Sequence, residues 1–427
     1  MVKVTNEAKY IWNSECIGSI FTFYANNTLS REYMVPEDGN IQNVHYGDIL
    51  VKYGAILNCE RDTVPYVRKD INISTTFLQN GDIVMADTAE DDTVGKVVEI
   101  TNVGTRKLVS GLHTVFMRPR KDVFAPCFLG YFMNSKEFHD QLIPFITGIK
   151  VSSISRKCIK NIYVSYPSKS EQKAIAEALS DIDQLISATE KLIAKKQDIK
   201  KGLMQELLTG KRRLPGFTKE WCRLTLKEIG LFKKARGISR SNAQSGSIRA
   251  IRYGELYTLH DRYVVTYGSH ISTQVASEAT LVKRGDILFA ASGETKEEIG
   301  KCAAIIDQGE IFAGGDIIVF TPSVATDPFF LGTVLNTENV IKQKAEKGQG
   351  DAVVHIHIPE LEKISISIPS FEEQVAIGKI IFEFDSECLV LYKKLKKLHD
   401  IKQGMMSELL TGRIRLKEVK ETGELNE

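Results

Sequence analysis

The stretch from Pro167 to Leu214 occurs a second time from Pro369 to Leu416. Without a gap, each residue of the second copy lies 202 positions after its counterpart, and about 20 of roughly 48 aligned positions are identical. A different globular segment precedes each copy. The repeat therefore predicts a pseudo-twofold chain in which two dissimilar domains alternate with two copies of one long element.

The repeated element is predicted to be a helix with its own start and stop signals. Pro-Ser-x-x-Glu at 167–171 and 369–373 predicts a capping box, with Ser binding orphan N–H groups and Glu bonding back. Gly210 and Gly412 fit the left-handed position that ends a helix. About 40 residues lie between these signals, or roughly 60 Å of helix.

Apolar residues spaced three and four apart along both copies predict a coiled-coil seam and not a general core face. We expect the two copies to pair antiparallel, because a globular domain separates them. Lys200 and Lys402 interrupt the seam at equivalent places, where a charge can fix the register; a contact with a partner is the alternative. The seam positions are Ile175, Leu179, Ile182, Ile186, Ile193, Leu203 and Leu207, then Ile377, Ile381, Phe384, Cys388, Leu391, Leu395, Leu398, Met405 and Leu409.

Both globular segments read as mixed α/β (α+β) domains. Short β-branched runs next to Gly-Asp and Asn-Gly turns predict strands at 48–51, 81–84, 96–100 and 285–288. The predicted organisation is a first domain at 1–166, a helix at 167–214, a second domain at 215–366, a helix at 367–416 and an acidic tail at 417–427.

Composition limits the class of protein. The 427 residues carry a net charge of only +2, so any nucleic-acid surface must be local. Seven scattered cysteines without a C-x-x-C pair argue against disulfides and zinc and for a reducing compartment. The start of the chain has no apolar signal segment, and no run of 18 apolar residues occurs, so we expect a cytoplasmic protein without a membrane span.

Taken together, these features resemble the specificity subunit of type I restriction–modification systems over the whole chain. The motifs are Pro-x-x-x-Glu-Gln at 167–172 and 369–374, Leu-Leu-Thr-Gly at 207–210 and 409–412, and Arg-Leu-Pro-Gly-Phe at 213–217 followed by Trp221. Their ordered combination is specific, although each alone is weak. The segment around Trp12 departs from the pattern, which leaves the start of the first domain open.

The resemblance implies a role in DNA recognition. Each domain would be a target recognition domain that reads one half of a split, asymmetric double-stranded DNA sequence. The paired helices would hold the readers apart and dock two copies of the adenine-methylating modification subunit, and a motor-nuclease restriction subunit would join them. S-adenosylmethionine, ATP and Mg²⁺ are expected on those partners and no cofactor on this chain.

Candidate DNA-binding residues are the basic and amide side chains of the two domains, because Lys and Arg bind phosphates and Asn and Gln can read adenine. Segments 148–156 and 348–357 resemble DNA-proximal loops of the family. The candidates are Lys52, Arg61, Arg68, Lys69, Arg106, Lys107, Arg118, Arg120 and Lys150 in the first domain, and Lys233, Lys234, Arg236, Arg240, Asn242, Gln244, Arg249 and Arg252 in the second. Partner-binding candidates on the helices are Lys195, Lys200, Lys397 and Lys402.

Catalytic motifs are incomplete. Asp327-Pro328-Phe329-Phe330 resembles an amino-methyltransferase motif, but it lacks the second proline, and its counterpart Ala125-Pro126-Cys127-Phe128 lacks the acid. We therefore interpret it as a turn before a helix and the chain as non-catalytic. A stand-alone DNA methyltransferase or nuclease and a coiled-coil scaffold that binds no nucleic acid are the alternatives.

Overall fold

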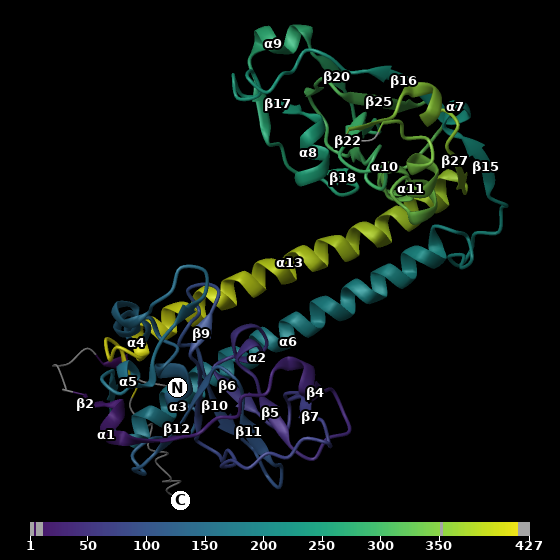
Figure 1. The fold of residues 1–427 in the computed structure, drawn as a ribbon. Helices are drawn as coiled ribbons and strands as arrows, with labels where there is room; N and C mark the ends of the chain where they lie inside the picture. Colours follow the sequence, from purple (N-terminus) through teal and green to yellow (C-terminus); the bar gives the residue numbers. More distant parts are fainter. Residues whose placement is uncertain (1–3, 6–11, 351–352, 417–427) are drawn as a thin grey trace, which may run out of the picture. The chain divides into compact units, whose positions relative to one another are not determined.

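The computed structural model describes residues 4–5, 12–350 and 353–416, and the chain divides into two compact units. Unit 1 comprises residues 1–190 and 394–427, and unit 2 comprises residues 191–393. Each unit holds one globular domain and part of both long helices, α6 (Lys169–Leu207) and α13 (Phe371–Leu409) (Figure 1). The predicted acidic tail at 417–427 lies outside the described residues.

The predicted long helices are confirmed. Each is 39 residues long. Gly210 and Gly412 follow them with φ values of 69° and 70°, which is the left-handed conformation expected at a helix end. None of the helices in the described ranges is both long and apolar enough to cross a membrane.

The glutamate half of both predicted capping boxes is wrong, and the serine half is confirmed for the first copy. The Ser168 hydroxyl does accept from the backbone N–H of Glu171, at 3.4 Å. The Glu171 carboxylate, however, accepts from Arg415 at 2.5 Å, and the equivalent Glu373 accepts from Arg213 at 2.7 Å. A guanidinium offers two parallel donors to a carboxylate, so the glutamates bind arginine and do not close the box. Within each unit, this pair ties the start of one long helix to the residues just after the end of the other.

The predicted seam is correct only in part. Ile182 and Ile186 of α6 pack against Leu398 of α13 in unit 1, as expected for paired helices. The first turns behave differently, because Ile175 and Leu179 join the domain core of unit 1, and Ile377 and Ile381 join that of unit 2. The start of each helix is therefore a core element of the domain that precedes it.

Each domain is built on a five-stranded and a four-stranded sheet, and the strand order of the five-stranded sheet is the same in both units. The neighbours in the larger sheet are antiparallel, except that its last pair is parallel. In unit 1 this sheet is β3 (Phe21–Tyr24), β12 (Thr114–Pro119), β8 (Ile83–Ala86), β10 (Val97–Thr101) and β6 (Ile56–Asn58). In unit 2 it is β16 (Gly230–Lys234), β25 (Ile317–Pro322), β21 (Ile287–Ala290), β23 (Cys302–Ile305) and β18 (Tyr263–Val264).

The larger sheet is buried on both faces. In β8, Ile83 and Met85 point into one apolar cluster and Val84 and Ala86 into another, as the alternation of a strand requires. The first cluster includes α3 (Phe128–Phe132) and the start of α6. The corresponding helix of unit 2 is α10 (Pro328–Val334). The sheet edge that carries β6 in unit 1, and β18 in unit 2, thus lies beside the long helices.

Three of the four predicted strands are confirmed as β8, β10 and β21. The strand predicted at 48–51 is wrong, because Tyr46–Val51 forms helix α2. The His45 ring accepts from the Gly47 N–H at 3.2 Å and caps this helix, while Arg31 pairs with the buried Asp48 at 2.6 Å. These contacts, one of them between distant residues, outweigh the β propensity of a short run.

Candidate nucleic-acid interface

In unit 1, Arg118 is held by the domain itself. Its guanidinium donates to both oxygens of Asp82 at 2.7 Å and to the Phe77 carbonyl at 3.0 Å. The same group lies 5.0 Å from the ring centre of Tyr24. Burial raises the pKa of Asp82, and the Arg118 contact opposes that effect. A cation committed to a buried carboxylate in this way stabilises the fold and has few donors left for phosphate.

Other predicted residues of unit 1 have acidic neighbours that are at least partly exposed. Arg61 pairs with Asp62 at 3.0 Å, Arg68 pairs with Asp70 at 2.5 Å, and Lys69 pairs with Asp38. Such exposed pairs are weak, so DNA could displace the acids. The Lys52 ammonium binds the Thr63 carbonyl.

Four predicted cations of unit 1 have no acidic partner among the described residues. Arg106, Lys107, Arg120 and Lys150 are exposed. Arg120 touches only the Thr22 hydroxyl, at 3.1 Å, and the Ser19 carbonyl, at 3.5 Å. These four side chains present net positive charge to solvent.

The basic run of unit 2, residues 233–252, also contains both cations without an acidic partner and cations that are paired. Lys233 and Lys234 lie on β16, and Arg236 and Arg240 lie in the loop that follows; all four are exposed, and the part of the chain that the structure describes shows no acidic partner for them. Arg249 pairs with Asp307 at 3.3 Å and binds the Gln308 carbonyl at 2.7 Å.

The remaining candidates of unit 2 form local contacts. Arg252 lies 3.6 Å from Glu255 and donates to the Ser269 hydroxyl at 3.1 Å. The side-chain amide oxygen of Asn242 accepts from the Ser239 N–H at 2.7 Å, and the Gln244 side-chain amide donates to the Gly268 carbonyl at 2.6 Å. Base contact by these side chains stays a prediction that would require them to exchange partners.

The four predicted partner-binding lysines fall into two pairs. Lys195 and Lys397 are exposed on the long helices. Lys402 pairs with Asp183 at 2.6 Å in unit 1, and Lys200 pairs with Asp385 in unit 2. These two salt bridges link α6 to α13 at equivalent positions of the repeat, which fits the predicted role of the lysines in fixing the helix register.

The two loops ahead of the long helices are alike in backbone and different in side chains. Gly148 and Gly350 have φ values of 125° and 110°, and each loop closes on an antiparallel bridge. The loop of unit 1 leaves Ile149 fully exposed beside Lys150, a feature that the search for charged residues missed. Residues 351–352 of the other loop lie outside the described part.

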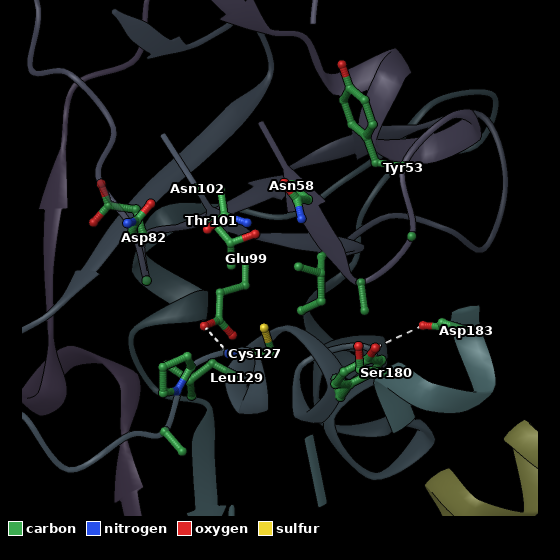
Figure 2. A pocket seen from close by; sticks show the side chains of 18 of the residues that line it. Tyr53, Asn58, Asp82, Glu99, Thr101, Asn102, Cys127, Leu129, Ser180 and Asp183 are labelled. Atoms are coloured by element: carbon green, nitrogen blue, oxygen red, sulfur yellow. Dashed lines mark hydrogen bonds between the residues drawn. The ribbon is translucent and has the colours of Figure 1, made fainter. Parts of the chain in front are cut away.

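A cavity of about 1320 Å³ in unit 1 brings several candidates together (Figure 2). It runs between the β6–β10 edge of the sheet, α3 and the first half of α6. The predicted residues that line it are Lys52, Arg61, Arg118, Arg120 and Lys402.

A cavity of about 1330 Å³ in unit 2 was not predicted. It lies between the second half of α6 and α11 (Glu338–Ala345). Its basic residues come from separate segments of the sequence, so no local run of charge marks them; they are Lys200, Lys201, Lys211, Arg223, Arg262 and Lys342.

The motif at Asp327 has a structural role. The Asp327 carboxylate accepts from the Phe330 N–H at 2.9 Å and caps α10, as the interpretation of a turn before a helix predicts. Burial raises the pKa of Asp327, and these backbone donors lower it. In unit 1 the position of this acid is occupied by Ala125. Glu99 of β10 supplies a carboxylate instead, which accepts from the Cys127 N–H at 2.6 Å and from the Gly130 N–H at 2.8 Å.

Comparison with known proteins places this geometry in a family. The profile of the type I restriction modification DNA specificity domain matches residues 12–200 and again 218–400. A putative type I restriction enzyme MjaX specificity subunit of Methanocaldococcus jannaschii is 27% identical over 362 residues, 82% of each chain. The type I restriction enzyme MjaVIII specificity subunit of the same organism is 26% identical over 292 residues, 63% of this chain and 66% of the relative.

Solved structures show the same fold. The type I restriction-modification system S subunit from M. genitalium has a TM-score of 0.59 at 16% identity and covers 94% of this chain and 97% of its own. A chain solved in work on complex assembly and conformational transition of the type I R-M system has a TM-score of 0.55 at 14% identity, with 95% and 99% covered. The predicted α/β fold with two long helices is thereby confirmed.

Proposed function

The chain belongs to the type I restriction–modification DNA specificity family, and on that premise we propose that each unit reads one half of a split, asymmetric DNA target. One observation carries the proposal: the family profile matches twice, on two domains that share the strand order of the larger sheet but differ in their exposed residues. Two different readers on one chain give an asymmetric bipartite site.

Affinity would come mainly from the exposed cations that have no acidic partner in the described residues. In unit 1 these include Arg106, Arg120 and Lys150, and in unit 2 Arg236 and Arg240. Lys and Arg neutralise phosphates and displace condensed counterions, so binding should weaken steeply as salt rises. Base edges would be read by polar and apolar side chains of the loops, among them Ile149, whose methyl groups could contact thymine.

The long helices would set the gap between the half-sites. A 39-residue helix is roughly 58 Å long, which is of the order of one to two turns of B-DNA. Deleting four residues from both α6 and α13 should change the gap and leave both half-site sequences unaltered. Mapped sites with altered bases and an unaltered gap would contradict the proposal.

The same helices would dock two copies of an adenine-methylating modification subunit, and a motor-nuclease restriction subunit would join the complex. Exposed apolar residues support this role, including Leu192 and Ile199 of α6 and Leu389 and Tyr392 of α13 in unit 2. Lys195 and Lys397 would contribute charge at the rim. S-adenosylmethionine, ATP and Mg²⁺ would be bound by those partners, and this chain would carry out no chemistry.

The complex would act in the cytoplasm, which is consistent with seven free cysteines. A simple assay tests the non-catalytic part of the proposal: the purified chain, incubated with DNA and S-adenosylmethionine, should transfer no methyl group. Adding the modification subunit should start methylation, whereas methylation by the chain alone would contradict the assignment.

The decisive experiment exchanges one domain. Replacing residues 215–366 with the corresponding domain of another family member should change one half of the methylated sequence and leave the other half as it was. Methylated adenines would be mapped across the genome of strains that carry the wild-type chain, the exchanged chain or neither. Unchanged methylation motifs after the exchange would overturn the proposed function.

A further inference from the structure

The cavity of unit 1 lies where unit 2 has a cluster of aromatic rings, although the larger sheet has the same strand order in both units. The register of the sheets gives the correspondence: Ile56 lies beside Glu99 in unit 1, and Tyr263 lies beside Ala304 in unit 2. By the constant offset of 202 residues, Cys127 of unit 1 corresponds to Phe329 of unit 2, and Ser180 corresponds to Phe382.

In unit 2 these positions form a cluster of three rings. Tyr263 lies 5.5 Å from Phe329 and 5.9 Å from Phe382, and the two phenylalanine rings are 4.6 Å apart. Together they fill the space between the edge strand β18, the start of α10 and α13. Such aromatic packing is typical of a domain core.

In unit 1 the equivalent side chains are Ile56, Cys127 and Ser180, so the rings are missing and a cavity remains. Figure 2 shows the Glu99 carboxylate next to Cys127 on one side of this space and Ser180 on the other. A cavity of this volume is large enough to hold water, which a side chain of matching shape can displace.

Glu99 gives the cavity a chemical preference. Glu99 is only 2% exposed, and its carboxylate accepts from backbone N–H groups at the start of α3, among them those of Cys127 and Gly130. Burial raises the pKa of Glu99 to about 7, so the ionised form lacks the solvation it needs. Each carboxylate oxygen has a second lone pair, and a ligand that brings an N–H donor would meet this need.

The rim of the cavity favours a polypeptide over nucleic acid. Most cations of the rim are already neutralised within the unit: Arg61 by Asp62, Arg118 by Asp82, and Lys402 by Asp183. Lys169 pairs with Asp122 and Lys121 with Glu15. DNA would have to displace these acids before the cations could bind phosphate, which lowers its affinity for this rim.

We propose that this cavity receives an aromatic side chain with an N–H donor, a tryptophan indole, from the modification subunit that docks on α6. The inference rests on the proposed function. The ring would occupy the space that Phe329 and Phe382 fill in unit 2, and its N–H would donate to Glu99. Because unit 2 fills this space with its own rings, the two copies of the modification subunit would bind in non-equivalent ways.

The test fills the cavity with the residues that unit 2 uses. The full-length Cys127→Phe/Ser180→Phe variant is titrated with the purified modification subunit of its own system, and stoichiometry and affinity are read by calorimetry and native mass spectrometry. Wild type should bind two copies, whereas the variant should bind one normally and the other about tenfold more weakly or worse, as expected for loss of an aromatic anchor. Ser277→Phe, which adds a ring to the exposed face of α9 (Thr273–Glu278) in unit 2, should leave both sites unchanged.

A second measurement needs no substitution. In wild type, the bound modification subunit should slow alkylation of Cys127 at least about tenfold, because the inserted side chain would cover this thiol. If the filled variant retains the wild-type unfolding midpoint and still binds two copies equally, the inference is wrong while the proposed function stands. If instead only duplex affinity falls, the occupant is nucleic acid and the polypeptide assignment is wrong. A wild-type chain that binds no modification subunit overturns both.

Discussion

Arg262 of unit 2 donates from Nη2 to both oxygens of Asp385, at 2.9 and 3.0 Å. The Lys200 ammonium and the Tyr263 hydroxyl bind the same carboxylate. Asp385 lies on α13, Lys200 on α6, and the other two belong to the globular domain. One carboxylate therefore links the domain of unit 2 to both long helices.

Asp385→Asn should destabilise unit 2. The Arg262 side chain is only 8% exposed, and removing the charge of Asp385 leaves this buried cation with the exposed Asp261 as its acidic partner, which costs about 3 kcal/mol. The equivalent substitution in unit 1, Asp183→Asn, should cost about 1 kcal/mol, because Asp183 and Lys402 are partly exposed. Urea unfolding of both full-length variants gives the two values, and equal losses would contradict this ranking.

The long helices could be predicted from the sequence, and the Asp385 contacts could not. Helix periodicity and the stop glycines are local patterns that the repeat shows twice. Arg262 and Asp385, in contrast, are separated by 123 residues, and nothing in either local sequence indicates the other. The glutamate half of the capping boxes failed for the same reason, since Arg213 and Arg415 reach the glutamates from distant segments.

Glu99 should make the stability of the protein fall as pH rises. Its pKa is raised by burial from the ordinary 4.5 to about 7, so the folded state holds a proton that the unfolded state releases. The stabilisation is complete below pH 4.5 and is lost as pH rises through about 7, a change of about 3 kcal/mol. The Glu99→Gln variant lacks this titrating group. The difference between the unfolding free energies of wild type and variant should therefore change between pH 4.5 and about 7.

The control for this titration is an exposed carboxylate. Glu177→Gln changes a side chain that is 64% exposed on α6. Its unfolding free energy should follow that of wild type at every pH. Parallel curves for wild type and Glu99→Gln would show that burial does not shift this group.

Lys344 should give the opposite slope. This side chain is 1% exposed, and its ammonium donates to the carbonyls of Gly300 and Leu335, at 2.8 and 3.1 Å. Burial lowers the pKa of Lys344 below the ordinary 10.5, so the unfolded state binds more protons and stability rises with pH up to about that value. Lys344→Met removes this rise, whereas Lys363→Met, at an exposed position, keeps it. Unfolding free energies at pH 7 to 10 distinguish the two cases.

The candidate DNA surface could be predicted as a set of residues but not as an arrangement. A basic run such as 233–252 can be read from the sequence, yet side chains of the same type in it have different roles. Arg236 and Arg240 extend from a loop, whereas Arg249 faces Asp307 and the ring of Tyr267, 5.0 Å away. Which arginine is free depends on acids that are distant in sequence.

This difference predicts two kinds of variant in the basic run. Arg236→Ala and Arg240→Ala should each weaken binding of the assembled complex to any duplex and reduce the slope of log K against log salt by about 1, because each removes one phosphate contact. Arg249→Ala should leave that slope unchanged and lower the unfolding midpoint, because it frees Asp307 and the Gln308 carbonyl. Fluorescence anisotropy on specific and random duplexes at several salt concentrations measures the slopes. If instead Arg249→Ala reduces the slope of log K against log salt and the other two variants do not, Arg249 must leave Asp307 and bind phosphate.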